Sequence, residues 1–94
     1  MQFEHLQNSR GGEFFYNDLN GQRLAEISYQ WKDQTHIIAD HTWVDDALRG
    51  QGVARQLLDA LVNFAREKHL KIVPICSYVE VMFRRDSNLN DVRA

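Results

Sequence analysis

Hydrophobic residues recur at helical spacing in two stretches of the chain. In the longer stretch, five apolar side chains fall on one face of a 3.6-residue repeat. They are Leu57, Leu58, Leu61, Val62 and Ala65. The shorter stretch, 77–85, directs Val79, Met82 and Phe83 inward. This pattern predicts two amphipathic helices in the second half of the chain.

Alternation of apolar and polar residues predicts strands in the first half. Residues 24–31 alternate well, and four of their side chains share one face. They are Ala25, Ile27, Tyr29 and Trp31. Residues 14–16 predict a shorter strand that reaches 24–31 through Asn20-Gly21, a strong hairpin signal. After a turn at 32–34, residues 35–44 are expected to form a buried strand.

A last apolar strand, 72–75, follows the long helix. Because Pro74 cannot donate a ladder hydrogen bond, we expect a sheet edge or a break in pairing there. The order of elements predicts an α/β (α+β) fold. Its sheet is mixed and mostly antiparallel, with one βαβ unit and a C-terminal helix. The chain has no repeats or linkers, so residues 1–94 are expected to form a single domain.

Two glycines lie between the strand at 35–44 and the long helix. Gly50 and Gly52 carry no Cβ, so the backbone there can approach an anion closely. Free N–H groups at the helix start and the helix dipole together suit a phosphate or pyrophosphate. Arg49 adds a charged donor at the mouth of the loop. Glycines between a strand and a helix are also common turn residues, so the spacing alone leaves that simpler explanation open.

The residues around the glycines narrow the choice of ligand. The dinucleotide fingerprint needs a small residue where Arg55 stands, and the Walker loop needs Gly-Lys-Ser/Thr. What remains is Arg-x-x-Gly-x-Ala, formed by Arg49, Gly52 and Ala54. This pattern resembles the acyl-CoA pyrophosphate loop of the GNAT superfamily of N-acetyltransferases. The segments 41–44 and 71–78 follow the same order and spacing as in the minimal, single-domain branch of that superfamily.

The resemblance implies how acetyl-CoA is bound. In the GNAT fold, the strands flanking the pyrophosphate helix splay apart, and the pantetheine arm of the cofactor enters the gap. Here this implies pantetheine contacts at Trp43 and Val44. The pyrophosphate contacts would come from the loop residues Arg49, Gly50, Gln51, Gly52, Val53 and Ala54. The implied activity is acetyl-CoA-dependent transfer of an acetyl group to an amine, without a metal.

Cys76 stands just after the last strand, at the start of the second predicted helix. Free N–H donors there can lower the pKa of its thiol and favour the thiolate. A thiolate beside the thioester could accept the acetyl group and pass it on. The alternative is a buried cysteine without a chemical role. Direct attack by the amine is preferred over an acetyl-Cys76 intermediate.

His41 is the leading candidate for the general base, because its ordinary pKa lies near working pH. It is also open to a purely packing role. Asp40 could serve instead if strand alternation turns His41 away, since adjacent residues face opposite sides. The resemblance makes Tyr78 a candidate proton donor to the departing CoA thiolate, with a core position as its alternative. His5, His36 and His69 have no comparable setting and receive no role.

Two charged pairs are given structural roles. Asp45 and Asp46 have no His or Cys at ligand spacing, so they are expected to start a turn and not to hold a metal. Arg84 and Arg85 could reach a cofactor phosphate, but a charged helix end already explains them.

Charge and cysteine content indicate the setting of the protein. Thirteen acidic and eleven basic residues give a net charge of −2, so no general binding to nucleic acid or anionic membranes is expected. A single cysteine fits a reducing compartment. The N-terminus lacks signal-peptide features, and no segment approaches membrane-spanning length. A cytoplasmic location is therefore expected.

The acceptor side departs from the family pattern. Typical members carry two helices after the first strand, whereas this chain has only residues 7–12 there. An open acceptor side favours a peptide or protein amine. Two other functions stay open: a non-catalytic acyl-CoA-binding module, and a structural domain whose glycine turn binds nothing.

Overall fold

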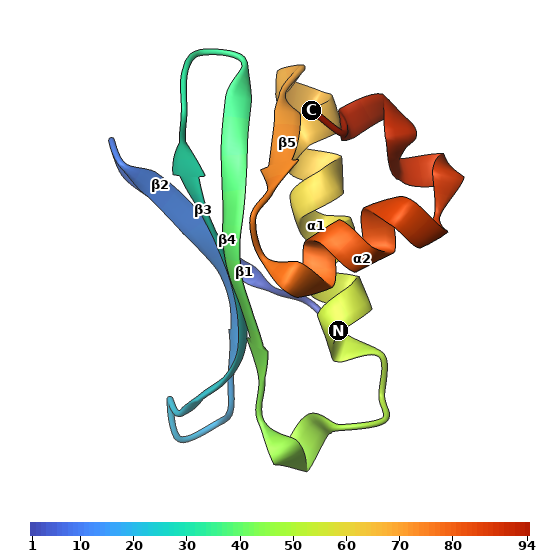
Figure 1. Cartoon of the computed structure of the whole chain (residues 1–94). Helices are drawn as coiled ribbons and strands as arrows, with labels where there is room; N and C mark the ends of the chain where they lie inside the picture. Colours follow the sequence, from blue (N-terminus) through green and yellow to red (C-terminus); the bar gives the residue numbers. More distant parts are fainter.

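The computed structural model describes residues 1–94 as a five-stranded sheet with its helices on one side (Figure 1). The strands are β1 (Glu4–Gln7), β2 (Gly11–Asn17), β3 (Arg23–Trp31), β4 (His36–Val44) and β5 (Lys71–Pro74). The helices are α1 (Val53–Lys68) and α2 (Ser77–Arg85), with short 3₁₀ segments η1 (Asp46–Leu48) and η2 (Ser87–Val92). The strands follow chain order, and only β4 and β5 are parallel. The predicted mixed sheet with a βαβ unit is confirmed.

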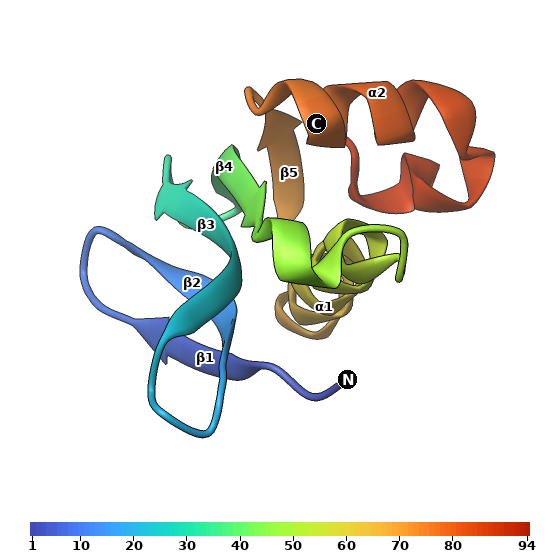
Figure 2. The same ribbon diagram turned by 90° about the horizontal axis from the view of Figure 1, so that it is seen from below.

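The sheet curls around α1, which lies against its inner face (Figure 2). All five apolar residues predicted for this helix are buried, and they join a core cluster of 19 residues. From β3, Ala25, Ile27 and Tyr29 enter the same cluster, while Trp31 packs against it. Complete burial of a leucine such as Leu57 stabilises the fold by about 1.5–3 kcal/mol.

The structure adds a strand, β1, that the hydrophobic pattern does not predict. Its only aliphatic side chain, Leu6, is exposed, so it has no amphipathic signal. Antiparallel pairing with β2 holds it in place, and Gln7 lies opposite Gly12. β2 therefore begins at Gly11 and not at residue 14. A Cβ at Gly11 would collide with the carbonyl oxygen of Tyr29, so this close approach of β2 to β3 requires glycine.

β4 is buried only in its first half, so the expectation of a buried strand over 35–44 is partly wrong. Ile37 and Ala39 are inaccessible to solvent, whereas the residues after Ala39 are half-buried or exposed. β5 covers the edge of β4 only as far as the pair Ala39–Pro74. Beyond this pair Ile75, assigned to the strand in the sequence analysis, is 66% exposed.

The C-terminal third of the chain closes over the parallel edge of the sheet. α2 has the predicted bounds, with Val79 and Phe83 buried and Met82 half-buried. The following η2 segment was not predicted, because its two buried residues, Leu89 and Val92, are a single apolar pair three positions apart, too short a pattern to define a helix. No helix here has both the length and the apolar content that a membrane crossing requires.

Candidate functional site

β4 and β5 form a gap where their pairing stops. The last pair is Ala39–Pro74, after which β4 continues to Val44 without a strand neighbour on that side. The carbonyl oxygen of Ala39 accepts hydrogen bonds from the N–H groups of Ile75 (3.1 Å) and Cys76 (2.8 Å). These bonds turn the chain away from β4 and into α2. The free edge of β4 can therefore pair with an extended ligand.

The glycine loop presents a row of free donors at the start of α1. The N–H groups of residues 50–55 donate to no group in the chain, and the first helical bond joins Gln56 N–H to the Gly52 carbonyl at 3.1 Å. Gly50 and Gly52 have positive φ angles of 79° and 71°, which non-glycine residues rarely adopt. Gly52 is also the N-cap of α1 and supplies no side chain to satisfy these donors. This arrangement suits a diphosphate.

A small hollow joins this loop to the end of β4. Its volume is about 220 Å³. Its lining comprises Val44, Leu48, Arg49, Gly50, Gly52, Val53 and Ala54. Arg49 has a 77% exposed side chain, and its Nε lies 2.9 Å from Asp46 Oδ1. The ion pair with Asp46 thus keeps the guanidinium of Arg49 at the mouth of the loop.

Cys76 faces β4 across the gap. Its Sγ lies 3.3 Å from Thr42 Oγ1, within hydrogen-bonding reach for sulfur, and both side chains are half-buried. Cys76 occupies the N-cap position of α2, and its side chain makes no capping bond. Thr42 is a residue of the candidate site that the sequence analysis did not single out. Sequence spacing contains no signal for it, because the contact joins residues 34 positions apart.

A β-bulge in β4 places Asp40 and His41 on the same face. Ser28 pairs with His41 and Tyr29 pairs with Ala39, so Asp40 has no partner in β3. Both side chains point away from α1, toward the polar residues of β3. The expectation that adjacent residues of this strand face opposite sides is wrong at the bulge.

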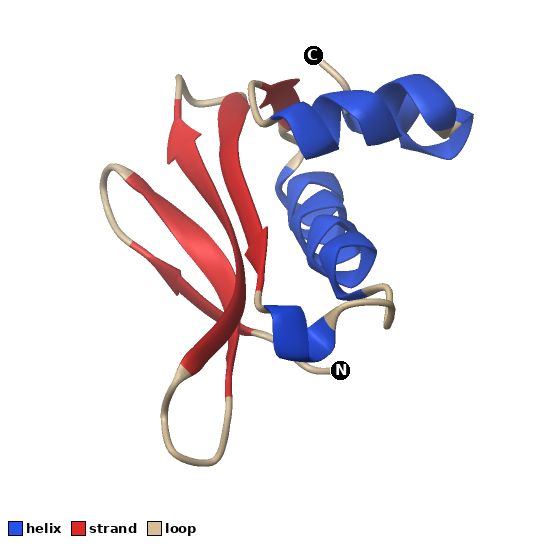
Figure 3. Cartoon of the chain, turned by 60° about the horizontal axis from the view of Figure 1, so that its bottom comes forward, coloured by secondary structure: helices blue, strands red, loops and turns tan.

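The contacts of these two residues bring in three groups that the sequence analysis did not single out. Asp40 accepts hydrogen bonds from Ser28 Oγ (2.7 Å) and Gln30 Nε2 (2.6 Å). His41 Nε2 lies 3.3 Å from Glu26 Oε2, and the His41 side chain is 53% exposed. No helix covers the outer face of the sheet (Figure 3). Asp40 and His41 follow directly after the last β4–β5 pair, so this face holds a carboxylate and an imidazole beside the gap.

Trp43 and Val44 extend the site along the free edge of β4. Trp43 lies opposite Glu26 on the outer face and is 39% exposed. Val44 packs against the core and lines the hollow beside the glycine loop. The two residues thus line the path between the loop and the gap.

Tyr78 lies on α2, half-buried against the core. Burial raises the pKa of its phenol, while the charge of Arg55 acts in the opposite direction. The hydroxyl is therefore protonated at neutral pH. It retains the proton that a general acid has to supply.

The remaining candidates have structural contacts. Asp45 accepts a hydrogen bond from Ala47 N–H (2.9 Å) and starts η1, in agreement with the predicted turn. Arg84 pairs with Glu80 at 2.9 Å, one turn earlier on α2. His5 is hydrogen-bonded to the Tyr29 hydroxyl (2.7 Å). The chain contains no cluster of three His, Cys, Asp or Glu side chains suited to a metal ion.

Comparisons with known proteins agree on one family. A sequence profile described as GCN5-related N-acetyl-transferase matches residues 13–92. The chain is 33% identical over 81 residues to Protein NATD1 of Gallus gallus, covering 85% of this chain and 71% of the relative. With Protein NATD1 of Homo sapiens the identity is 32% over 76 residues, covering 80% and 67%.

Solved structures give the same result. An NMR structure of a GCN5-like protein from Staphylococcus aureus is 40% identical, with a TM-score of 0.76, covering 97% of this chain and 87% of that one. The GNAT family N-acetyltransferase YhbS from Escherichia coli, solved in complex with CoA, is 21% identical with a TM-score of 0.64. It matches 79% of this chain and 43% of its own. At this level of identity, the similarity to YhbS shows that the two proteins share a fold.

Proposed function

This chain belongs to the GCN5-related N-acetyltransferase family, and we propose that it transfers the acetyl group of acetyl-CoA to an amine. The observation that supports this most directly is the row of free N–H groups at residues 50–55, next to the unpaired edge of β4. One feature suits the diphosphate of CoA and the other suits its pantetheine arm. They lie in sequence order along a single path.

The residues of the loop would hold the diphosphate chiefly through the backbone. Donors at the start of α1 and the helix dipole favour negative charge there. Arg49 adds a charge-assisted hydrogen bond from the mouth of the loop. With the diphosphate in the loop, the pantetheine arm would lie along the free edge of β4 and contact Trp43 and Val44. Two proteins with this fold, from Escherichia coli and Elizabethkingia anophelis, have been solved with CoA and acetyl-CoA respectively.

We assign deprotonation of the acceptor amine to His41. Its imidazole is exposed on the outer face, and Glu26 lies close enough to orient it. Asp40 is the second candidate, held by Ser28 and Gln30. As the amine nitrogen bonds to the acetyl carbon, the carbon–sulfur bond breaks. Tyr78 then gives its proton to the departing thiolate.

Cys76 lies beside the proposed thioester position, against Thr42. Direct attack by the amine is the main route, and transfer through an acetyl-Cys76 is the alternative. The second route requires a free thiol, and Cys76 is the only cysteine of the chain. A reducing compartment such as the cytoplasm would preserve it.

Two measurements test the proposal. Calorimetric titration should detect binding of acetyl-CoA, and release of free CoA thiol should follow when an amine is added. Binding of acetyl-CoA without turnover on a panel of amines and peptides would support the alternative, a non-catalytic acyl-CoA-binding module. Absence of binding would leave the glycine loop as a structural turn.

A further inference from the structure

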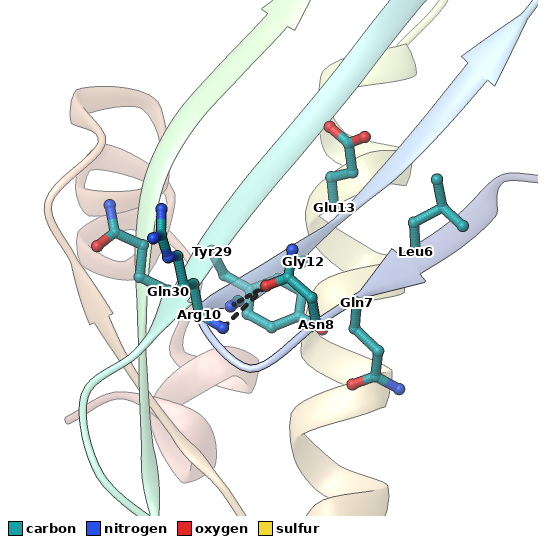
Figure 4. A pocket seen from close by; sticks show the side chains of 9 residues that line it. Leu6, Gln7, Asn8, Arg10, Gly12, Glu13, Tyr29 and Gln30 are labelled. Atoms are coloured by element: carbon teal, nitrogen blue, oxygen red, sulfur yellow. Dashed lines mark hydrogen bonds between the residues drawn. The ribbon is translucent and has the colours of Figure 1, made fainter.

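A second hollow lies at the turn between β1 and β2, away from the glycine loop (Figure 4). Its volume is about 500 Å³, more than twice that of the hollow beside Val44. Asn8 shapes the turn, since its Oδ1 accepts hydrogen bonds from the N–H groups of Arg10 (2.8 Å) and Gly11 (3.2 Å). Gly11 and Gly12 bring the backbone of β2 close to Tyr29, which forms part of the hollow's wall. The size suits a small organic molecule.

The free charge in this hollow is positive. Its one carboxylate, Glu13, is already engaged, because Arg23 holds both of its oxygens at 3.1 and 3.3 Å. Arg23 in turn lies over the ring of Phe15, 3.8 Å from its centre. The guanidinium of Arg10 has no carboxylate partner, and only main-chain atoms of Arg10 form hydrogen bonds in the chain. An anionic group of a ligand would therefore find a free planar donor.

Gln30 connects this hollow to the candidate site. It lines the hollow and donates a hydrogen bond to Asp40 at 2.6 Å. Arg10 therefore lies at one end of a polar path across the outer face, and Asp40 with His41 lies at the other. β3 is the single strand between β2 and β4; Arg10 lies level with Trp31 and His41 lies level with Ser28, so the backbones at the two ends are about 14 Å apart. The path carries positive charge at one end and negative charge at the other.

We propose that this hollow binds the non-reacting part of the acceptor, and that the acceptor is an amine whose skeleton also carries a carboxylate. The proposal rests on the acetyltransferase function proposed above. The carboxylate pairs with Arg10, which can donate two parallel hydrogen bonds. The amine then reaches Asp40 and His41. A free diamino acid and a peptide with a C-terminal lysine both have this chemistry.

A matched pair of acceptors tests the proposal. Nα-acetyl-lysine and Nα-acetyl-lysinamide carry the same amine, and only the first has a carboxylate. We expect kcat/KM to be roughly tenfold higher for the acid, as a charge-assisted hydrogen bond implies. Arg10→Gln should remove this preference by lowering kcat/KM for the acid alone. Lys68→Gln, which removes an exposed cation at the far end of α1, should retain it. Replacing Nα-acetyl-lysine by an N-acetylated tetrapeptide ending in lysine then distinguishes a free amino acid from a peptide.

A binding measurement separates failure of this proposal from failure of the proposed function. In NMR titrations, acetyl-CoA should shift the amide signals of Gly50 and Gly52, and Nα-acetyl-lysine should shift those of Gly11 and Gly12. Equal kcat/KM for the acid and the amide, or equal losses for both in Arg10→Gln, would overturn the proposal. If no amine is acetylated, saturable shifts at Gly11 and Gly12 with the acid alone still support the binding site. Absence of such shifts overturns it.

Discussion

At the scale of single residues, the bulge in β4 decides which groups an acceptor amine would meet. Asp40 and His41 are neighbours in the chain and would normally point to opposite faces of the sheet. Asp40 has no backbone pairing partner in β3, and this bulge brings both side chains to the outer face. There Asp40 accepts a hydrogen bond from Ser28, and His41 lies close to Glu26. A base and a carboxylate therefore lie together on the uncovered side of the sheet.

Replacement of His41 tests its role as the base. We expect His41→Ala to lower kcat by roughly 10²–10⁴-fold, the usual contribution of a general base. The rise in rate with pH should flatten, and the affinity for CoA should stay unchanged. Rates over a pH series and calorimetric titration provide these two readouts. If CoA binding or thermal stability falls while turnover stays near normal, His41 is structural.

Alkylation tests the position of Cys76. If its thiol lies at the reacting end of the gap, saturating CoA should protect it from iodoacetamide, as followed by mass spectrometry. Incubation with acetyl-CoA alone should also leave a slowly hydrolysed acetyl mark if the cysteine accepts the group. Equal labelling with and without CoA would place Cys76 away from the thioester. Full activity in Cys76→Ser would show that the thiol is near the reaction but not needed for it.

At the scale of elements, the turn from β4 into α1 carries the cofactor proposal. Both glycines have positive φ angles, and the space where their Cβ atoms would project is open. Substitution at Gly52 therefore meets no clash within the chain. It changes the backbone conformation and the approach of a ligand.

Two substitutions at Gly52 separate these effects. Gly52→Val should abolish CoA binding, because a β-branched residue resists positive φ and its side chain blocks close approach. Gly52→Asn is the matched variant, since asparagine tolerates positive φ but still adds a side chain. Calorimetric titration of both, with circular dichroism to verify folding, gives the result. Unchanged affinity in folded Gly52→Val would contradict the cofactor assignment.

Arg49 contributes to the same loop through its side chain. We expect Arg49→Ala to weaken CoA binding by about 1.5–3 kcal/mol, the range for a hydrogen bond to a charged group. Its partner Asp46 offers a control, because Asp46→Asn removes the ion pair but leaves the guanidinium free to bind phosphate. An affinity unaffected by Arg49→Ala would place this side chain outside the site.

At the scale of the whole molecule, β1 completes the sheet through contacts with distant residues. His5 stacks on Phe14, with ring centres 4.0 Å apart, and is hydrogen-bonded to Tyr29. Burial lowers the pKa of His5 and raises the pKa of Tyr29 to about 12. His5 and Tyr29 thus connect β1 to the core. Because His5 can take up a proton, the stability that this connection contributes depends on pH.

The sign of that sensitivity follows from the lowered pKa of His5. The unfolded chain binds a proton at this residue more readily than the folded one, with an ordinary pKa of about 6.5. The contribution of neutral His5 is therefore fully present above that pH and is lost as pH falls through its folded pKa. We expect the Tm to fall between pH 7.5 and pH 5, and His5→Phe to reduce the fall. His69→Gln serves as the control, and an unchanged pH dependence in His5→Phe would exclude this role.

The sequence by itself determined the elements whose signals are local. Both helices, the glycine turn and the strand at β3 follow from repeats and turn residues within a few positions of one another, and the structure confirms them. Only the tertiary structure decided β1, the bulge at Asp40 and the meeting of Thr42 with Cys76. Each depends on the register between segments far apart in the chain, and a shift of one residue there turns a side chain to the other face. The sequence therefore identifies the residue types of the candidate site, but the face to which each side chain points is set by long-range strand pairing.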